Sequence, residues 1–300
     1  MNPKKTLTIF THIPKSGGTT FNSIIKTQYP EKGYFVMIPD DPVKKSLQDL
    51  ETKIEKEGVG LVGGHVQFGL HQFLSQPCQY ITFLRNPIEL TLSHYYFFRL
   101  KKEYRSSIKE IVKFAQTHSV EEYCCKIHSN AMTRFISGVD FDELYKWGYL
   151  KYLEKKIMNL APSDEEDASE EMLEAAKSNL KNYFQVVGLT ERFDETLILL
   201  KEKLSWRNVH YLKKNTTKNR PKSEQHSSQV LATLKKYNEL DLELYSYAEE
   251  LFEKQIKNHG GNFQSQLKLF QILNGQGSKI KAIRKKGSSL KKKILNQLNR

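Results

Sequence analysis

Five short runs of apolar and β-branched residues interrupt an otherwise polar chain. The first run, at residues 6–11, has the sequence TLTIFT, and four more follow at residues 34–38, 59–63, 79–84 and 183–188. Runs that are apolar at nearly every position, rather than at every second one, are typical of strands buried on both faces of a parallel sheet. The pattern therefore predicts a central sheet of mainly parallel strands.

The segments between these runs have the composition and spacing of helices. Residues 43–57 are typical of a polar amphipathic helix. Asn86 and Pro87 are the preferred cap and first residue of another helix, which we expect to reach about residue 102. Further helices are expected over residues 19–26, 68–74, 107–160 with breaks near 138 and 148, 191–203 and 228–257. Strands that alternate with helices define the α/β class, in which the crossovers are right-handed.

The positive charge of the chain is concentrated at one end. The 300 residues carry a formal charge of +13, and residues 279–300 contain nine Lys and Arg with no Asp or Glu. Nine subtracted from thirteen leaves +4 for residues 1–278, which is an ordinary value, so nucleic acid is not an expected partner. We expect one domain over residues 1–273 and a flexible or amphipathic basic tail over residues 274–300.

Apolar residues are interleaved with the basic residues of this tail. They recur at spacings of 3, 4 and 7, at Ile280, Ile283, Leu290, Ile294 and Leu298. A basic amphipathic helix of this kind binds the surface of an anionic membrane. A disordered, solubilising end and a contact with a polyanionic glycan are the alternatives.

The number of cysteines and the length of the apolar runs indicate in which cellular compartment the protein is expected. Cys78, Cys124 and Cys125 lack the spacing of a metal site and are too few for a disulfide scaffold, so no metal is expected. No run approaches the ~20 apolar residues of a membrane span, and residues 1–5 lack the apolar stretch of a secretory signal, so none is expected. The expected location is cytoplasmic, with a peripheral position on the inner face of a membrane as an option.

The most distinctive motif is IPKSGGTT at residues 13–20, between the first predicted strand and a helix. Gly17 and Gly18 allow a tight turn that directs backbone N–H groups at an anion, and the helix adds the positive end of its dipole. Lys15 supplies a charge. A Walker A loop differs, because its lysine follows the glycines. The motif predicts a loop that binds phosphate or sulfate, and a turn that needs Gly-Gly only for its geometry is the alternative.

The sequence HIPKSGGTTF resembles the 5′-phosphosulfate loop of the carbohydrate sulfotransferases, the group that includes heparan sulfate 2-O-sulfotransferase and bacterial relatives. Three more stretches are similar to motifs of this group and follow in its order: GHVQFGLH at 64–71, FLRNP at 83–87 with SHYY at 93–96, and NTTKNRP at 215–221 with NELDLELY at 238–245. The resemblance implies a P-loop-NTPase-like sheet with helical insertions. It also implies a transfer of a sulfuryl group from 3′-phosphoadenosine-5′-phosphosulfate (PAPS) to a carbohydrate hydroxyl, with 3′,5′-ADP as the product.

The resemblance and the chemistry of the loop together assign candidate residues. The 5′ side of the nucleotide would be bound by Lys15, Ser16, Gly17, Gly18, Thr19 and Thr20, the 3′-phosphate by Arg85 and Ser93, and a closing loop would add Thr217 and Arg220. Lys15 would also stabilise the charge that grows on the leaving phosphate. His65, just past the run at 59–63, is the expected general base for the acceptor hydroxyl.

Some residues keep alternative interpretations. His12 and His71 are reserve candidates for the base. The 2-O enzymes resemble His-Gly-His where this chain has Gly63, so one histidine of that pair is absent here. Arg134, in the segment NAMTRF, contacts the acceptor, braces the cofactor loop or forms an ion pair in the core.

Two other functions are considered. A P-loop-like kinase needs acidic residues that hold Mg²⁺, whereas the apolar runs here end beside His12, His65 and Arg85. A non-catalytic basic protein would bind nucleic acid or membrane through the tail. The sequence does not specify the glycan acceptor, and the Golgi lumen, where animal relatives of the resembled group reside, is the alternative location.

Overall fold

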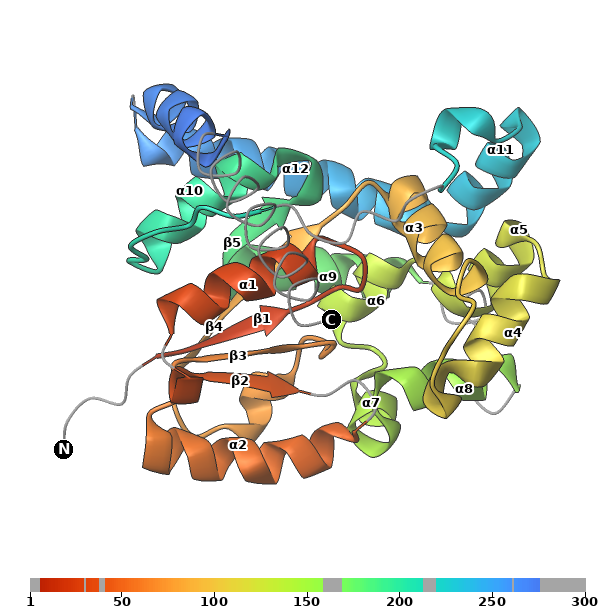
Figure 1. The fold of residues 1–300 in the computed structure, drawn as a ribbon, viewed down its shortest axis with the longest axis horizontal. Helices are drawn as coiled ribbons and strands as arrows, with labels where there is room; N and C mark the ends of the chain where they lie inside the picture. Colours follow the sequence, from red (N-terminus) through yellow and green to blue (C-terminus); the bar gives the residue numbers. More distant parts are fainter. Residues whose placement is uncertain are drawn as a thin grey trace, which may run out of the picture.

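A computed structural model describes residues 6–29, 31–37, 41–158, 169–212, 220–260 and 262–275. Its centre is a sheet of five parallel strands in the order β2-β3-β1-β4-β5 (Figure 1). The strands are β1 (Leu7–Thr11), β2 (Tyr34–Met37), β3 (Leu61–Gly64), β4 (Cys78–Leu84) and β5 (Phe184–Leu189). The predicted α/β class, with a central parallel sheet flanked by helices, is confirmed.

Helices cover the sheet and extend beyond one of its ends. They are α1 (Gly18–Gln28), α2 (Val43–Glu57), α3 (Pro87–Arg99), α4 (Lys109–Thr117), α5 (Val120–Tyr123), α6 (Ala131–Ser137), α7 (Phe141–Trp147), α8 (Tyr149–Ile157), α9 (Glu170–Tyr183), α10 (Phe193–Lys203), α11 (Ser228–Tyr237), α12 (Glu239–His259) and a last helix over residues 263–275. Helices α10 and α12 pack on β5, and α2 packs on β2. The strand arrowheads point toward the helical insertion α4–α8 (Figure 1). The carboxyl ends of the strands therefore face this insertion.

Several predicted boundaries differ from the observed ones. Strand β3 begins at Leu61 and includes Gly64, because ladder pairing uses the backbone and Gly64 pairs with both Thr11 and Met37. Residues 68–74 contain only a short 3₁₀-helix, Leu70–Phe73. Residues 228–257, for which one or two helices are predicted, contain two helices that meet at Asn238, whose side chain donates a hydrogen bond to the Leu234 carbonyl.

Aromatic packing fixes the first strand to the first helix. The ring of Phe21 on α1 lies 4.7 Å from that of Phe10 on β1 and 4.8 Å from that of Phe83 on β4, both edge to face. All three side chains are buried. Edge-to-face pairs of this kind add to the free energy of burial. The β1–α1 connection, which carries the candidate phosphate loop, is thus held between two rigid elements.

The starts of α3 and α6 are capped in different ways. Asn86 accepts a hydrogen bond from the Glu89 N–H, with Pro87 at the first position of α3, as the sequence predicts. The start of α6 is capped from another helix, because the buried Asp241 of α12 accepts hydrogen bonds from the N–H groups of Met132 and Thr133. Burial raises the pKa of Asp241 to about 6, although these hydrogen bonds act in the opposite direction.

The last described helix, residues 263–275, crosses the predicted domain boundary at 273. Residues 276–300, nearly all of the predicted basic tail, lie outside the described part of the chain. The division into a domain over 1–273 and a tail therefore stays a prediction. No helix within the described ranges combines the length and the apolar character that crossing a bilayer requires.

We predict that Asp241→Ala lowers the free energy of unfolding by about 3 kcal/mol at pH 7.5, because it leaves buried donors at the start of α6 unpaired. Urea denaturation measures this change. Asp49→Ala, an exposed site on α2, is the control and should alter the free energy by no more than about 0.5 kcal/mol. Equal effects of the two substitutions would contradict the role of Asp241.

Candidate active site

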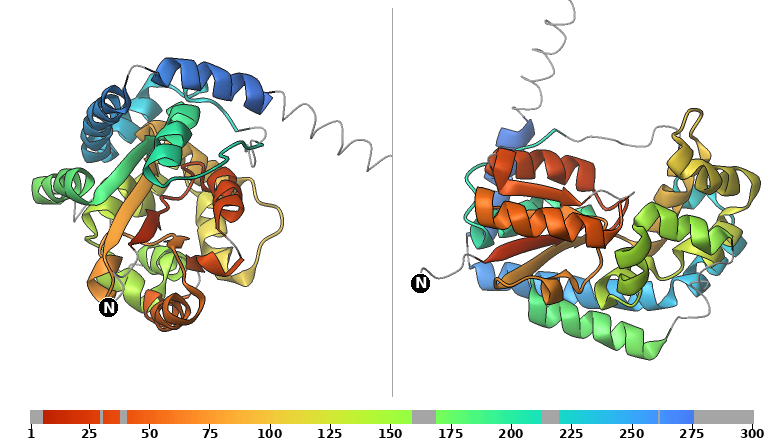
Figure 2. Two further views of the ribbon diagram at one scale, coloured as in Figure 1. Left: turned by 90° about the vertical axis from the view of Figure 1, so that its left-hand side faces the viewer. Right: turned by 90° about the horizontal axis from the view of Figure 1, so that it is seen from below.

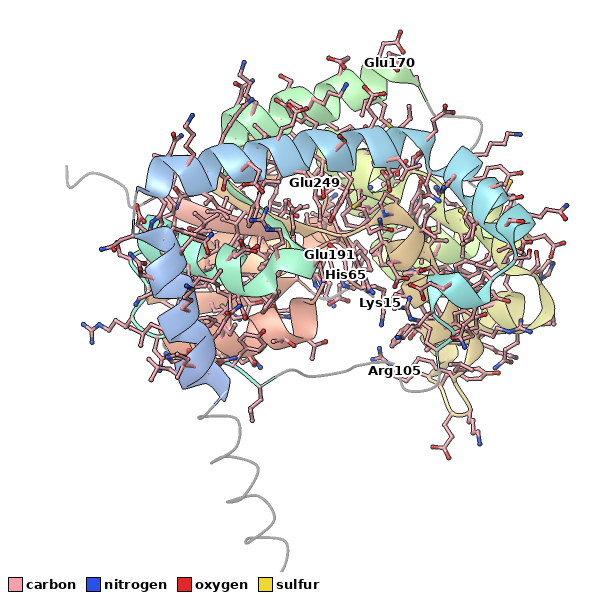
Figure 3. All side chains as sticks on the ribbon, turned by 90° about the horizontal axis from the view of Figure 1, so that it is seen from above. Lys15, His65, Arg105, Glu170, Glu191 and Glu249 are labelled. Carbon is pink, nitrogen blue, oxygen red and sulfur yellow. The ribbon has the colours of Figure 1, made fainter. Side chains whose placement is uncertain are left out.

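The residues that directly follow three neighbouring strands converge at one edge of the sheet. His12 follows β1, His65 follows β3 and Arg85 follows β4. Ligands of open α/β sheets bind beyond the carboxyl ends of the strands. Lys15 and His65 lie together near the middle of the molecule (Figure 3), and the charge of Lys15 acts on the His65 ring. This edge is the candidate active site.

The predicted phosphate loop has an unusual backbone. Lys15 has φ 71°, in the left-handed region that non-glycine residues rarely adopt, and Gly17, the N-cap of α1, has φ 80°. Arg85 donates a hydrogen bond of 2.8 Å from Nη1 to the Lys15 carbonyl. A charge-assisted hydrogen bond of this kind offsets the conformational cost at Lys15. The end of β4 therefore holds the loop that follows β1.

Two features of the loop suit an anion. The buried Ser16 hydroxyl makes no hydrogen bond with any described residue. No side chain caps the start of α1, whose Thr20 and Phe21 N–H groups donate to the Gly17 carbonyl. The unpaired Ser16 hydroxyl, the positive end of the α1 dipole and the nearby Lys15 together suit the binding of phosphate or sulfate oxygens. Thr19 is exposed and Thr20 is buried in the first turn of α1.

Four cationic side chains surround the loop. Burial, followed by the charges of Arg85, Lys101 and Arg220, lowers the pKa of Lys15 to about 8. Lys101 was not identified from the sequence, because it follows the end of α3 in a segment with no recognisable motif. Like charges gathered this closely repel one another unless an anion offsets them. The cluster therefore favours the binding of a multiply charged anion.

A glutamate joins two of these cations. Glu89 on α3 pairs with Arg85 at 3.5 Å and more closely with Arg220, whose Nη1 also donates to the Glu89 carbonyl at 3.2 Å. Burial alone would raise the pKa of Glu89, but the hydrogen bond and charge of Arg220 and the charge of Arg85 lower it. The structure thus brings Arg220 of the predicted closing loop to the predicted 3′-phosphate residue Arg85. Thr217 lies outside the described residues.

Ser93, the other residue expected at the 3′-phosphate, lies two turns further along α3. It is buried and forms no hydrogen bond within the described residues. No hydrogen bond links it to Arg85 in the part of the chain that the structure describes.

The ring of Phe97 on α3 contacts the ammonium groups of two lysines. The Nζ of Lys15 lies 3.9 Å from the centre of the Phe97 ring, and the Nζ of Lys101 lies 4.6 Å from it. Tyr95 and Phe98 are buried in the core, whereas Phe97 is 38% exposed. A cation over a ring face is attracted to it. The exposed aromatic of this helix therefore holds the loop lysine beside the site.

His65 has the properties of a neutral base. Its side chain is half-buried, and its Nδ1 is buried and makes no hydrogen bond with any described residue. Burial, and then the charge of Lys15, lower the pKa of His65 to about 4. The imidazole is neutral at pH 7, which is the form that accepts a proton.

His12 lies directly beside His65, with ring centres 4.7 Å apart. The His12 ring also packs against the start of α1, where a Cβ built on Gly18 would lie 1.8 Å from its Nε2. Burial, then His65 and Lys15, lower the pKa of His12 well below its usual value. Sequence reasoning kept His12 in reserve, although its position directly after a predicted strand, like that of His65, was a signal of this proximity.

A chain of hydrogen bonds lies behind His65. The ring of Tyr149 packs edge to face on His65, with centres 5.1 Å apart, and its hydroxyl lies 3.2 Å from Nε2 of the buried His94. The Tyr123 hydroxyl lies 2.8 Å from the other ring nitrogen of His94. These hydrogen bonds fix the orientation of Tyr149. The Tyr149 ring in turn limits the movement of the His65 ring on the side where the two pack together. A small pocket beside His65 is lined by residues that include Met37, Asp41, Ser46 and Tyr149.

Other candidate residues have structural partners. His71 pairs with the Tyr80 hydroxyl at 2.8 Å, toward the start of β4 and away from the candidate site. The buried Arg134 forms a two-point ion pair with Asp140 at 2.9 and 2.6 Å, so that the core ion pair is the correct interpretation. A Cβ built on Gly63 would lie 3.0 Å from the Tyr34 hydroxyl and 3.3 Å from the Phe10 ring, so a histidine here would require these side chains to shift.

A family model described as Galactose-3-O-sulfotransferase matches residues 55–268. The matched range contains His65, Arg85, Ser93 and Arg220 and begins after the phosphate loop. The predicted class, a carbohydrate sulfotransferase family, is thereby confirmed. Because the match covers more than half of the chain, the chain belongs to the Galactose-3-O-sulfotransferase family.

Curated relatives share limited identity with the chain. Heparan sulfate 2-O-sulfotransferase of Caenorhabditis elegans is 28% identical over 206 residues, which cover 65% of this chain and 59% of the relative. Heparan sulfate 2-O-sulfotransferase 1 of Xenopus laevis is 26% identical, and that of Mus musculus 24%, each over 274 residues that cover 82% of this chain and 70% of the relative. The chain thus spans less than two thirds of the length of the worm relative.

We predict that Gly18→Ala lowers the free energy of unfolding by about 1–3 kcal/mol, because the added methyl group displaces the His12 ring. In a His12→Ala background the same substitution should cost little or be stabilising, since alanine is the better helix former. A double-mutant cycle by urea denaturation measures the difference. The same cost in both backgrounds would contradict the contact.

Proposed function

We propose that this protein transfers a sulfuryl group from PAPS to a hydroxyl group of a carbohydrate. One observation carries the proposal, which is the juxtaposition of the cationic phosphate loop and the neutral His65 at one edge of the sheet. A cationic loop binds an anionic donor, and a neutral imidazole beside it takes a proton from an acceptor. Membership of a carbohydrate sulfotransferase family supports this interpretation.

PAPS supplies the sulfuryl group and leaves as 3′,5′-ADP. The unpaired Ser16 hydroxyl and the uncapped start of α1 suit its 5′ phosphosulfate, for which we propose binding by Lys15, Ser16, Gly17, Gly18, Thr19 and Thr20. Arg85 and Ser93 would bind the 3′-phosphate, and Arg220, with Thr217, would close over the nucleotide. Two phosphates at opposite ends of one ligand would offset the repulsion among the four cations.

We propose that Lys15 stabilises the transition state. Negative charge grows on the bridging oxygen as the phosphate leaves, and a cation fixed there binds that state more strongly than the ground state. The contact with Phe97 and the Arg85 bond to its carbonyl limit where the ammonium group can move.

His65 would act as general base toward the acceptor hydroxyl. A pKa of about 4 in the ligand-free protein makes it a weak base. Anionic oxygens bound at the loop would raise this pKa toward neutrality, because they favour the imidazolium form. We propose that His12, 4.7 Å away, limits the rotation of His65 and supplies the neighbouring imidazole that position 63 lacks.

The acceptor is proposed to be a glycan that reaches His65 through the pocket beside Tyr149. The family description names galactose and the relatives' names specify heparan sulfate, so that galactosides and heparan-type polysaccharides are the first candidates. A kinase is disfavoured, because Glu89 is bonded to Arg220 and Glu191 accepts hydrogen bonds from the Asn86 N–H and the Tyr245 hydroxyl. Neither carboxylate is free to hold Mg²⁺ as a kinase requires.

Incubation with ³⁵S-labelled PAPS and a panel of galactosides and polysaccharides tests the function. We expect labelled product on at least one glycan. 3′,5′-ADP at about 100 times its Kd should raise the melting temperature by about 5 °C. Stabilisation by ATP–Mg²⁺ without an effect of 3′,5′-ADP would favour the kinase instead.

His65→Ala should lower kcat by about 10²- to 10⁴-fold, because the base is lost, and leave the Kd for 3′,5′-ADP within about threefold. Turnover assays and isothermal titration measure the two effects. His71→Gln, a histidine outside the site, is the control and should keep kcat. Normal turnover of the His65 variant would exclude it as base.

Affinity for 3′,5′-ADP should depend on the charge of Lys15. With a pKa of about 8, Lys15 is protonated below pH 8. Above pH 8, Lys15 of the free protein is mostly neutral and must take up a proton when the nucleotide binds. The Kd should therefore be constant from pH 7 to 8 and rise about tenfold per pH unit above 8. Lys15→Arg should remove this dependence, because arginine stays charged. An unchanged Kd at pH 9.5 in the unmodified protein would contradict the proposed contact.

A further inference from the structure

We propose that the last helix, residues 263–275, and the basic segment that follows it dock on the surface of an anionic lipid bilayer. Three large apolar side chains lie on this helix in contact with solvent: Leu269 is 58% exposed, Ile272 57% and Leu273 45%. Positions three and four residues apart share one face of a helix. The three side chains therefore form a continuous apolar surface, which we call the Leu269 face.

The Leu269 face is presented by a firmly anchored helix. On its other side Phe263 and Phe270 are buried, and Phe270 stacks on His210 with ring centres 5.0 Å apart. Near the end of the helix, Asn274 accepts a hydrogen bond of 2.8 Å from the Tyr211 N–H. The helix lies along the outer surface of the molecule (Figure 2). The exposure of the apolar face is thus a property of how the helix is packed.

The charge of the adjoining sequence identifies the partner. Residues 279–300 contain nine Lys and Arg and no acid. Beyond Leu273, apolar residues recur at intervals of 7, 3, 7 and 4, at Ile280, Ile283, Leu290 and Ile294, which continues the spacing of the Leu269 face in the sequence. Basic residues are attracted to the headgroups of an anionic membrane, and apolar side chains enter the boundary between headgroups and acyl chains. An anionic bilayer offers both contacts at once.

Other occupants fit less well. A polyanionic glycan would be bound by the basic residues alone and gives no reason for an exposed leucine-rich face. A second copy of this chain would bring another nine positive charges of the same segment close to the first nine. The bilayer is therefore the partner that both the apolar and the charged features favour.

Sedimentation of the full chain with large unilamellar vesicles tests the proposal. The chain should bind vesicles with about 30% phosphatidylserine and lose about tenfold in affinity on neutral phosphatidylcholine vesicles. The combined change Leu269→Ser, Ile272→Ser and Leu273→Ser should weaken binding to the anionic vesicles about tenfold or more. The combined change Lys291→Glu, Lys292→Glu and Lys293→Glu should also weaken binding to the anionic vesicles about tenfold or more. Val139→Ser removes a side chain that is 51% exposed elsewhere and should have no effect.

Circular dichroism and melting curves establish that each variant is folded. Sulfuryl transfer to a soluble glycan should be unchanged in each variant, so the outcome of this test is independent of the test of the proposed function. Vesicle binding that survives loss of the Leu269 face would overturn the proposal. Equal binding to neutral vesicles would do so as well, as would retention on heparin without any vesicle binding. A dimer in analytical ultracentrifugation that the serine variant abolishes, without vesicle binding, would assign the face to a second copy instead.

Discussion

The hydrogen bond from Arg85 to the Lys15 carbonyl is the interaction on which the candidate site depends. It joins the first residue after β4 to the loop after β1, two segments that are 70 residues apart in the sequence. Lys15 has a left-handed backbone that costs a non-glycine residue about 1–2 kcal/mol. A hydrogen bond to a charged group contributes about 1.5–3 kcal/mol, which is enough to hold that conformation. The same bond fixes the guanidinium group of Arg85 at the edge of the loop.

The cost of this arrangement is a concentration of like charge. Lys15, Arg85, Lys101 and Arg220 act on one another, with Glu89 paired to the two arginines. Such a cluster is unfavourable without an anion, and its repulsion lowers the pKa of Lys15 as burial does. Part of the affinity for a doubly phosphorylated nucleotide would then come from relief of a strain that the folded protein carries in its free state.

The histidines beside the cluster follow from the same electrostatics. His12, His65 and His94 are each kept neutral by burial first and by neighbouring charges second. Neutral rings can pack at 4.7 Å without repulsion, as His12 and His65 do. One edge of the sheet thus combines fixed cations with uncharged imidazole, and the proposed transfer rests on this combination. The Leu269 face belongs to a different helix, and the membrane contact proposed for it concerns location rather than chemistry.

The sequence by itself determined the features that depend on neighbouring residues. Apolar runs placed the five strands to within a few residues, and the cap at Asn86 and the turn at Gly17 were predicted because their conformations are set locally. The positions of Lys15, His65 and Arg85 at one edge also followed, since parallel strands end on the same side. Four short motifs in the right order, of which the segment at 13–20 is the first, were together enough to predict the family.

Only the tertiary structure decided which side chains from distant segments meet. Lys101 and Phe97 join the phosphate loop because α3 passes over it, and no pattern in their own segment marks them. His12 reaches His65 because Gly18 leaves room for its ring, and Arg134 is occupied by Asp140 rather than by a ligand. Hydrophobic periodicity indicates that a residue is buried, but it does not indicate which side chains the residue packs against. That choice depends on how whole helices pack, which the local sequence does not contain.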